Sequence, residues 1–503
     1  MLILYKSMRA VKTRKLLYNR NMTNIRTRFA PSPTGYIHVG NVRSALYPYF
    51  IARQNHGQFI LRIEDTDQSR FVAGAEDLII DVLKWLGLDW DEGPDSNGQE
   101  KGNFGPYHQT NRRAIYHEWA QKLVDAGLAY VDPRSHDELE ALKQVAANNH
   151  QLFLYREHRP EVTPAWTGHE ALRFKVPEAK SYHWHDEVMG DLSAGAEAVD
   201  DFIIMKSDGL PTYNFAHIVD DNLMQVTHVI RGQEYISSMP KYLALYDALG
   251  VKRPIFAHLP HILAPDGHKK LGKRDGAKSV TEYRDEGYLP EAMLNFLACL
   301  GWNDGTEQDI FTLDELISKF SFAHVQRSGA RFDEKRLLWM NAQWIKRLTV
   351  ADLATRVTKF WGEAGNTATP ERQLAVLTVV QDRLKTLADL PALSEYFFKR
   401  PTPDWTMVTN NKQLKKFDTA ELVNLLTAAK NALEDVDFTD EAALQDRLNQ
   451  LLVETNQKPM VLFGIIRFAL TWAPFSPGLP ETMRLLGRYE TLARLDAAIV
   501  AAN

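Results

Sequence analysis

Apolar and polar residues recur along the first hundred positions with two periods, one typical of strands and one of helices. The segment Ile-Arg-Thr-Arg-Phe at 25–29 is interpreted as a first strand, and it precedes a stretch whose apolar residues fall on one helical face: Val42, Ala45, Leu46, Tyr49 and Phe50. Gly57 is expected to end that helix. A mostly apolar run at 59–63 precedes another helical pattern at about 75–86. This strand–helix–strand–helix order predicts a parallel sheet covered by helices.

Beyond residue 130 the pattern changes twice. Between about 130 and 206, prolines and histidines increase and helices shorten, which predicts an inserted subdomain. The strand–helix pattern then resumes with four expected elements: a strand opened by Tyr213, a strand at 226–231, a helix at 238–249 and a strand at 255–263. From about 289 the chain is mostly helical, and two apolar sets mark late helices: Leu422, Leu425 and Leu426; Leu492, Leu495 and Ile499.

Composition places the chain among globular proteins. Its 503 residues allow roughly three to four domains. The hydrophobic content of 45% and the charged content of 24% are ordinary. The sequence has no apolar stretch of the ~20 residues that cross a bilayer, so no membrane association is expected. The single cysteine, Cys299, excludes an internal disulfide framework and a cysteine-rich zinc site.

Charge is distributed unevenly. The formal net charge is −5, and residues 1–24 contribute +6 without any acid: Lys6, Arg9, Lys12, Arg14, Lys15 and Arg20. The rest of the chain therefore carries −11 (−5 minus 6), so a nucleic acid would have to be held by local basic patches. We interpret the leader as preceding a true start at Met22, and a mitochondrial-type targeting arm is the alternative. In both cases it is expected to stay outside the fold.

The run Arg-Phe-Ala-Pro-Ser-Pro-Thr-Gly-Tyr-Ile-His-Val-Gly at 28–40 is the most informative segment of the chain. Its prolines favour a rigid turn after the first strand, and Gly40 lies where a helix begins. The free N–H groups and positive dipole of a helix start favour an anion, and His38 is placed to face a phosphate. The alternative is a proline-rich turn with a capping histidine that binds nothing.

A second cluster is basic. Residues 269–276 read Lys-Lys-Leu-Gly-Lys-Arg-Asp-Gly, with glycines among four cations. Lysines are flexible point charges that suit a pyrophosphate which must leave. A basic loop by itself is usually solvated surface, but together with the His38 turn this one indicates phosphate binding.

A third cluster combines acidic and aromatic residues near expected strand ends: Glu64, Asp65, Tyr213, His217, Asp220, Asp221, Arg231 and Glu234. The guanidinium of Arg231 matches the geometry of a small carboxylate ligand. A structural ion pair is the alternative interpretation.

Two further features carry weaker signals. His183 and His185 with Asp186 suggest either metal ligands or, as we favour, an exposed histidine-rich loop. Three lysines, Lys412, Lys415 and Lys416, form a basic stripe in the helical half. A solvated face is the default interpretation of that stripe, and phosphate contact is the alternative.

These motifs together resemble the class I aminoacyl-tRNA synthetases, and most closely the bacterial-type glutamyl-tRNA synthetases. The tetrapeptide His-Val-Gly-Asn at 38–41 is similar to the HIGH signature, and Lys-Leu-Gly-Lys-Arg at 270–274 is similar to KMSKS. Further similar blocks begin at Arg28 (RFAPSPTG), Leu61 (LRIEDTD), Trp85 (WLGLDWDEGP), Val219 (VDDNLM), Val229 (VIRGQEY) and Gly329 (GARFDEKRLLWMN). The resemblance covers almost everything after residue 24 and is weaker in the helical tail.

The resemblance implies a multidomain α/β plus α fold. A Rossmann-like parallel-sheet catalytic domain would contain an inserted acceptor-binding subdomain and precede an all-helical anticodon-binding region. The implied parts are these: 1–24, basic leader; 25–130, first half of the catalytic domain; 131–209, inserted acceptor-stem-binding subdomain; 210–345, second half of the catalytic domain with a stem-contact region; 346–503, anticodon-binding region.

The resemblance also implies the reaction. ATP and glutamate would form glutamyl-adenylate, and the acyl group would pass to the 3′-terminal adenosine of tRNA(Glu), with Mg²⁺ accompanying the ATP. Catalytic residues would be His38, Lys270 and Lys273. ATP would meet His38, Gly40, Glu234, Lys270, Lys273 and Arg274. Glutamate would meet Arg28, Ala30, Ser32, Glu64, Tyr213, His217 and Arg231, with Arg231 on its side-chain carboxylate and Glu64 on its ammonium. Candidate tRNA contacts are Lys412, Lys415 and Lys416.

The chain departs from the family pattern at several positions. Gly272 replaces the usual serine, and His217 stands at a pocket position that varies in the family. Residues 130–135 lack the cysteines of zinc-containing relatives, so no structural zinc and no other bound metal is expected. The resemblance further implies a cytoplasmic monomer, or a mitochondrial matrix enzyme if the leader is native.

Several alternatives stay open. A non-discriminating enzyme would also glutamylate tRNA(Gln). A shorter relative that glutamylates a modified base lacks the helical half, and a glutaminyl enzyme would carry C-terminal β-barrels. A small-molecule nucleotidylyltransferase shares the histidine turn but is usually much shorter. A non-catalytic tRNA-binding paralogue would be expected to lose His38, Lys273 or Arg231, and all three are present.

Overall fold

Two parallel strands and the helix between them begin the fold. In the computed structural model, β1 (Arg26–Phe29) pairs with β2 (Gln58–Leu61), and α2 (Val39–Gln54) connects them. Phe29 lies opposite Leu61, and the two strands are almost entirely buried. The structure describes residues 24–35, 37–178, 180–272, 278–473 and 475–502. The predicted opening of the fold is confirmed, because both strands and the helix lie where the apolar pattern places them.

A second group of strands extends the same layer. The order is β10 (His228–Gly232), β11 (Ile255–Leu259), β7 (Tyr182–Asp186) and β8 (Gly190–Ala194), with only β7 and β8 antiparallel. Thr227, just before β10, donates its backbone N–H to the carbonyl of Arg26 on β1 at 2.9 Å. The carboxyl ends of β1, β2, β10 and β11 therefore gather at one edge, where α/β sheets bind ligands.

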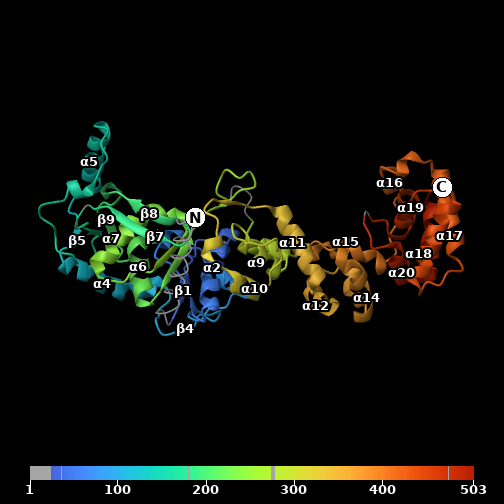
Figure 1. Ribbon diagram of the computed structural model, residues 1–503, viewed down its shortest axis with the longest axis horizontal. Coiled ribbons are helices and arrows are strands. Elements are labelled where there is room, and N and C mark those ends of the chain that lie inside the picture. Colours follow the sequence, from blue (N-terminus) through green and yellow to red (C-terminus); the bar gives the residue numbers. More distant parts are fainter. Residues whose placement is uncertain (1–23, 36, 179, 273–277, 474, 503) are drawn as a thin grey trace, which may run out of the picture. The chain divides into compact units, whose positions relative to one another are not determined.

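The segment with the altered sequence pattern contains an antiparallel sheet. Its strands are β5 (Ala129–Val131), β6 (Leu172–Phe174) and β9 (Phe202–Met205), in that order. Helix α5 (His136–Asn148) projects from this region (Figure 1). A buried aromatic and aliphatic core joins the antiparallel sheet to α4 (Arg113–Asp125), α6 (Tyr213–Leu223) and α7 (Met239–Leu249).

The described residues form two compact units. One holds the residues up to Thr281 with Leu294–Asp333, and the other holds Glu282–Met293 with the residues from Glu334 onward. The first unit also contains these helices and strands: α3 (Ala75–Trp85), β3 (Gly93–Pro94), β4 (Glu100–Lys101), β12 (Ile262–Leu263), α10 (Leu313–Lys319) and β13 (Ala330–Arg331). Helices α8 (Val280–Asp285) and α9 (Pro290–Ala298) follow the basic segment.

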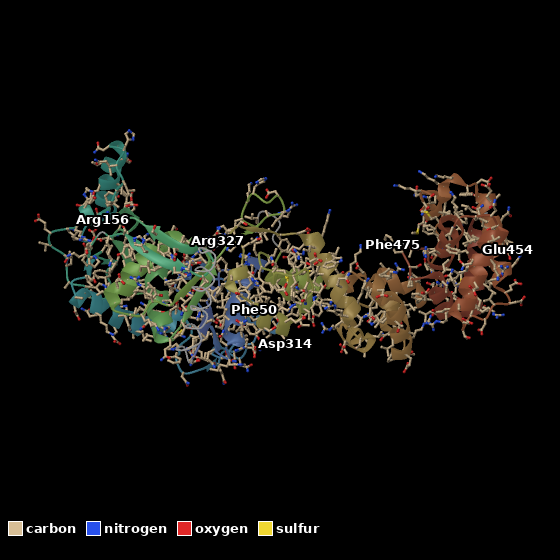
Figure 2. All side chains as sticks on the ribbon, in the orientation of Figure 1. Phe50, Arg156, Asp314, Arg327, Glu454 and Phe475 are labelled. Atoms are coloured by element: carbon tan, nitrogen blue, oxygen red, sulfur yellow. The ribbon has the colours of Figure 1, made fainter. Side chains whose placement is uncertain are left out.

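From Glu334 onward the structure is helical. The helices are α11 (Glu334–Arg347), α12 (Val350–Arg356), α13 (Glu363–Asn366), α14 (Pro370–Val380), α15 (Leu390–Ser394), α16 (Trp405–Thr409), α17 (Thr419–Leu433), α18 (Glu441–Glu454), α19 (Pro459–Thr471) and α20 (Leu479–Ala502). The two late apolar sets lie on α17 and α20, as predicted, and belong to one core. Phe50 of α2 is fully buried, and Phe475 exposes 73% of its surface. Both residues are labelled in Figure 2.

Several local predictions are wrong. Tyr213 begins the helix α6 rather than a strand. The strand expected at 255–263 is two strands, β11 and β12, because Pro260 lacks the N–H that a continuous ladder needs. Helix α2 ends at Gln54, and Gly57 instead allows close backbone packing, since a Cβ there would lie 2.1 Å from the Ile25 carbonyl oxygen.

Two other predictions concern the histidine-rich segment and the leader. His183 and His185 lie on the strand β7 and not in a loop. Residues 1–23, and with them nearly all of the basic leader, lie outside the described residues. Among the described helices, none is both long enough and apolar enough to span a bilayer.

Candidate active site

The histidine turn caps the first helix. His38 Nδ1 accepts a hydrogen bond from the backbone N–H of Gly40 at 3.0 Å, and the side chain of Asn41 accepts from the His38 N–H at 3.1 Å. Because Nδ1 is an acceptor, a neutral ring carries its proton on Nε2. A Cβ at Gly40 would lie 2.8 Å from the His38 ring, so glycine is what allows the ring to fold back onto the helix start.

The histidine turn and the basic segment that begins at Lys269 contribute residues to the same cavity. A cavity of about 150 Å³ is lined by residues from four segments, among them His38, Gly40, Arg43, Gly232, Glu234 and Lys270. Lys270 Nζ lies 3.0 Å from Glu234 Oε1, and His38 forms an antiparallel bridge with Ser279 beyond the basic segment. The expected convergence of the two motifs is therefore present. Lys273 and Arg274 lie outside the described residues.

Glu234 is held at the mouth of this cavity by its neighbours. Burial would raise the pKa of its carboxyl, but backbone and Lys270 hydrogen bonds outweigh burial and lower that pKa. A Cβ at Gly232 would lie 2.0 Å from Glu234 Oε2, so the carboxylate folds over that glycine. The Lys270 and Glu234 side chains are 54% and 43% exposed, so this ion pair can open when a phosphate competes for the lysine.

Arg231 lies at the end of β10 in a pocket of a different character. It is 6% exposed, and its guanidinium lies 4.9 Å and 4.6 Å from the ring centroids of Tyr235 and Tyr242. Its Nε donates to His258 Nε2 at 3.2 Å, and its NH1 lies 3.4 Å from His217 Nε2. Among the described residues, no carboxylate forms an ion pair with Arg231, although the cation is buried.

His217 completes this pocket as a neutral ring. Its Nδ1 donates to the carbonyl of Tyr213 at 2.7 Å, which leaves Nε2 as an acceptor toward Arg231. Burial, with the nearby Arg231 charge, lowers the pKa of His217 to about 3. The Tyr213 ring stacks on His217 with 4.8 Å between centroids. Burial also raises the pKa of Tyr213 well above its usual value, so its hydroxyl stays protonated.

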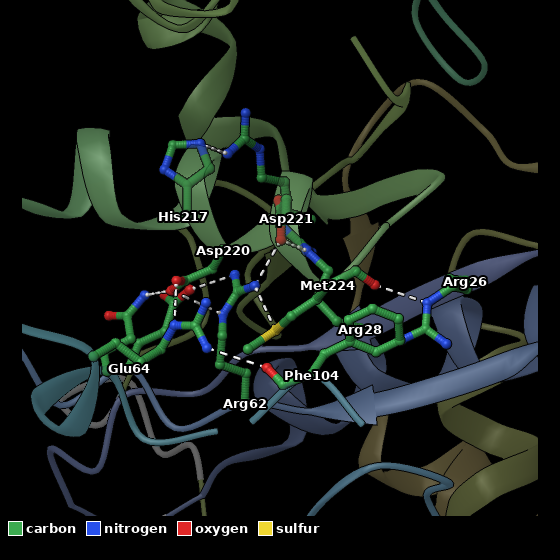
Figure 3. Close-up of polar contacts among 12 residues, drawn as sticks. Arg26, Arg28, Arg62, Glu64, Phe104, His217, Asp220, Asp221 and Met224 are labelled. Atoms are coloured by element: carbon green, nitrogen blue, oxygen red, sulfur yellow. Dashed lines mark hydrogen bonds and ion pairs between the residues drawn. The ribbon is translucent and has the colours of Figure 1, made fainter. Parts of the chain in front are cut away.

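A buried ion network connects Arg28 with Glu64. Asp221 Oδ1 accepts from Arg28 Nε at 3.1 Å and from Arg62 NH1 at 2.8 Å, while Arg62 NH2 donates to Glu64 Oε1 at 2.9 Å (Figure 3). Burial would raise the pKa of Asp221, but Arg28 and Arg62 outweigh it and hold that pKa well below its usual value. Burial raises the pKa of Glu64 in spite of Arg62. Two predicted ligands are thus fixed through one carboxylate and one arginine.

A second carboxylate supports the network from behind. Asp220 accepts from Arg112 Nε at 2.7 Å, from Gln109 Nε2 at 2.8 Å and from the Tyr116 hydroxyl at 2.9 Å. Arg62 Nε lies 3.8 Å away. Sequence reasoning did not find Arg62 or Arg112. The signal for Arg62 was its position two residues before Glu64, where a strand end turns the two side chains to one side.

The other predicted ligands differ in exposure. Ala30 is half-buried, and Ser32 is exposed and lines a second cavity of about 150 Å³ that also contacts His38. Lys412, Lys415 and Lys416 are all exposed, and Lys415 and Lys416 lie on a short 3₁₀ turn at Leu414–Lys416. None of the three is ion-paired to another described residue. Across the described residues, no group of three or more His, Cys, Asp or Glu side chains is arranged to hold a metal ion.

Asp186 has a role that the sequence did not indicate. It is fully buried and points away from His183 and His185, with its Oδ2 2.6 Å from Nδ1 of His258. The suggested ligand set of two histidines and this aspartate is therefore wrong. No sequence signal pairs Asp186 with His258, because the two residues lie 72 positions apart and meet only through the pairing of β7 with β11.

Comparisons with known proteins identify the family of the chain. The catalytic domain family of class I tRNA synthetases (E and Q) matches residues 24–339, and an anticodon-binding domain family matches residues 352–499. Curated glutamate–tRNA ligases of Dehalococcoides mccartyi (strain BAV1) and Chloroflexus aurantiacus are each 39% identical, over 484 and 495 residues. Each alignment covers 95% of this chain and 98% of the relative.

A solved structure supports the same grouping. The crystal structure of a glutamate tRNA ligase from Elizabethkingia meningosepticum in complex with its amino acid superposes with a TM-score of 0.83 at 31% identity. It covers 95% of this chain and 100% of that chain. The predicted Rossmann-like catalytic fold followed by a helical anticodon-binding region is confirmed. The chain belongs to the class I tRNA synthetases of the E and Q group.

Proposed function

We propose that this enzyme is a glutamate–tRNA ligase. The α-carboxylate of glutamate attacks the α-phosphorus of ATP, the bond to pyrophosphate breaks, and glutamyl-adenylate forms. A hydroxyl of the 3′-terminal adenosine of tRNA(Glu) then attacks the acyl carbon, and AMP leaves. Family membership supports the reaction type, and the names of the curated relatives support glutamate as the amino acid.

The observation that carries the choice of amino acid is the state of Arg231. This buried cation is surrounded by aromatic rings and by two acceptor imidazoles, and among the described residues it has no acidic partner. A substrate carboxylate would supply the missing negative charge through the two NH₂ groups of the guanidinium. Glutamine would bring a neutral amide instead, leaving the buried charge unpaired, which is the basis for strong rejection.

The ammonium and α-carboxylate of glutamate are assigned to the other end of the pocket. Glu64 is the acidic group available there, and Arg62 and Asp221 hold it beside Arg28. Ala30 and Ser32 follow on the turn after β1 and would line the passage toward the nucleotide. With this assignment, the α-carboxylate points to the cavity that His38 and Lys270 share.

ATP is assigned to that cavity. His38 offers Nε2–H, Gly40 opens the helix start, and Lys270 is an exposed lysine that can exchange Glu234 for a phosphate. Lys273 and Arg274 join this set by their motif. Phosphoryl transfer of this kind needs positioning and charge neutralisation rather than a covalent side chain. Mg²⁺ bound to the triphosphate would neutralise part of its charge.

The remaining assignments rest on the family. Residues 131–209 would bind the acceptor stem and the helical region from 346 the anticodon, with Lys412, Lys415 and Lys416 contacting phosphates. We place the enzyme in the cytoplasm as a monomer on the family resemblance. Whether tRNA(Gln) is also a substrate depends on anticodon contacts in that helical region.

The test of the proposed function is a charging assay with purified tRNA. Labelled glutamate and labelled glutamine are each offered with tRNA(Glu) or tRNA(Gln), with and without ATP. We expect ATP-dependent attachment of glutamate to tRNA(Glu) and no attachment of glutamine. Attachment of glutamine, or no charging of either tRNA by the intact enzyme, would contradict the proposal.

A further inference from the structure

Arg231 is anchored from behind by a chain of two buried side chains. Its Nε donates to His258 Nε2 at 3.2 Å, and His258 Nδ1 lies 2.6 Å from Asp186 Oδ2. His258 and Asp186 are both 0% exposed. The three residues lie on the neighbouring strands β10, β11 and β7, and His258 is directly opposite Arg231 in the parallel register.

Asp186 is an acceptor whose position is strongly fixed. Besides the His258 ring, it accepts the backbone N–H groups of Val188 at 3.0 Å, Met189 at 2.9 Å and His258 itself at 3.1 Å. Burial would raise the pKa of Asp186, but the hydrogen bond from His258 and these backbone donors lower it. A carboxylate can only accept, so it assigns the proton of the His258 ring to Nδ1.

The tautomer decides what His258 presents to Arg231. With the proton on Nδ1, a neutral ring has a lone pair on Nε2, and this lone pair receives the Arg231 Nε–H. Burial, opposed by Asp186, lowers the pKa of His258, so the ring is neutral. The bond occupies the inner edge of the guanidinium and leaves the NH1 and NH2 edge directed toward His217 and Met239.

We propose that Asp186 and His258 are positioning residues for substrate recognition: Asp186 sets the His258 tautomer, and His258 aims the Arg231 fork at the side-chain carboxylate of the amino acid. This inference rests on the proposed glutamate pocket. It extends that pocket into β7, a strand that precedes the antiparallel strand β9 in the inserted region. A carboxylate at the position of His258 would pair with Arg231 directly and compete with the substrate, whereas an imidazole orients the arginine without neutralising it.

Two substitutions of the same histidine separate orientation from packing. In His258→Asn, the amide NH₂ takes the place of Nδ1 and keeps the bond to Asp186, but nothing accepts from Arg231. In His258→Gln, the amide oxygen reaches the place of Nε2 and accepts from Arg231, but the bond to Asp186 is broken. The KM values for glutamate and for ATP are measured in tRNA charging, together with the thermal midpoint.

We expect His258→Asn to raise the KM for glutamate by about 10- to 100-fold, the loss of one hydrogen bond to a charged group, with the KM for ATP unchanged. His258→Gln should restore the KM for glutamate to within about threefold of the wild-type value. In Asp186→Asn the proton of the His258 ring is no longer fixed on Nδ1, so this variant should also raise the KM for glutamate, as His258→Asn does. If His258→Asn fails to fold, the comparison of Asp186→Asn with His258→Gln decides the matter in the same way.

A matched control is His228, a second buried histidine, which lies on β10 rather than β11 and whose ring is 2.9 Å from Thr227 Oγ1. His228→Asn should alter the thermal midpoint without changing the KM for glutamate. Equal effects of His258→Asn and His258→Gln on that KM, or no effect of either, would overturn the inference. An unchanged KM in Arg231→Ala would instead overturn the glutamate pocket itself, so the two failures are distinguishable.

Discussion

The two halves of the active site differ in how they hold charge. Around Arg231 and Glu64 the charged groups are buried: two imidazoles, His258 and His217, contact the Arg231 guanidinium, and the buried Arg62 donates to Glu64. Around His38 and Lys270 the decisive ion pair is half exposed, and the lysine is held by a single carboxylate, Glu234. One half is organised before a substrate arrives, and the other can exchange its partners.

This difference matches two chemical tasks. Selecting one amino acid requires that a wrong ligand leave a buried charge unpaired, which only a rigid and desolvated site can enforce. Activating that amino acid requires neutralising a pyrophosphate that forms and then departs, which suits a flexible lysine at the surface. Under the proposed function, the buried pocket around Arg231 would recognise the amino acid, and the exposed pair of Lys270 and Glu234 would adapt to the phosphates.

Replacing Arg231 should have the largest effect, a loss of kcat/KM for glutamate. In Arg231→Ala the glutamate carboxylate loses its partner in a desolvated pocket. The transition state should therefore lose roughly 3–5 kcal/mol of stabilisation, which lowers kcat/KM for glutamate by about 10²- to 5 × 10³-fold. The measurement is charging of tRNA(Glu) at varied glutamate. Arg253→Ala serves as the control, because Arg253 is an arginine paired with exposed Asp247. An unchanged kcat/KM would remove Arg231 from the pocket.

Replacing Lys270 should have a smaller effect, and it should act on kcat rather than on the KM for glutamate. We expect Lys270→Ala to lower kcat by about 10²-fold, close to 2.7 kcal/mol, because charge that develops on pyrophosphate is less well neutralised. The KM for glutamate should stay the same. Lys269→Ala, at the exposed neighbouring lysine, is the matched control. A rise in the KM for glutamate without a change in kcat would contradict the division of labour between the halves.

Acid should lower the free energy of unfolding, because His217 in the Arg231 pocket is neutral when folded and becomes protonated on unfolding. Its pKa is about 3 in the folded protein and about 6.5 when unfolded. Between these values the unfolded chain binds one more proton, so the free energy of unfolding falls as the pH falls, by about 1.4 kcal/mol per unit. The side chain in His217→Asn cannot be protonated, and between pH 7 and pH 5 this variant should lose about 2 kcal/mol less than the wild type.

Urea denaturation at the two pH values measures this effect. His117→Asn, a half-buried histidine outside the pocket, is the control for the loss of a histidine as such. Equal losses in His217→Asn and wild type would mean that His217 is charged, or exposed to solvent, in the folded protein.

The smallest predicted effect concerns the helical region. If Lys415 and Lys416 bind tRNA phosphates, replacing both by alanine should reduce the slope of log K against log salt by roughly one unit for each phosphate that is no longer neutralised. The measurement is tRNA binding by the full-length enzyme over a series of salt concentrations. Lys430, which pairs with Asp496 at 2.7 Å, provides the control variant Lys430→Ala. An unaltered slope in the double variant would assign both lysines to solvent.

Much of the sheet could be predicted because its signals are local. The strand β1, the turn with His38 and the helix α2 follow one another within about thirty residues, and each has a characteristic pattern. Helix α6 was mistaken for a strand although its polar residues Asn214, His217 and Asp221 recur at helical spacing, because in this helix the polar face is turned inward, toward Arg231 and the buried ion network, rather than to solvent.

The partners of the site residues could not be predicted in the same way. Asp221 lies 193 residues from Arg28, and Asp186 lies 72 residues from His258, so only the tertiary fold brings them together. The conformation of the His38 ring was also hidden, since its folding onto Gly40 depends on backbone geometry. Residue types at strand ends were enough to propose which groups bind a substrate, and the structure was needed to find what holds those groups in place.

The most direct test of the two-part site is a crystal structure with a non-hydrolysable analogue of glutamyl-adenylate, which spans both halves. We predict that its side-chain carboxylate lies within hydrogen-bonding distance of the Arg231 NH1 and NH2 groups, and that its adenylate end lies between His38 and Lys270. A glutamyl group bound away from Arg231, or an adenosine outside the cavity lined by His38 and Lys270, would contradict this assignment.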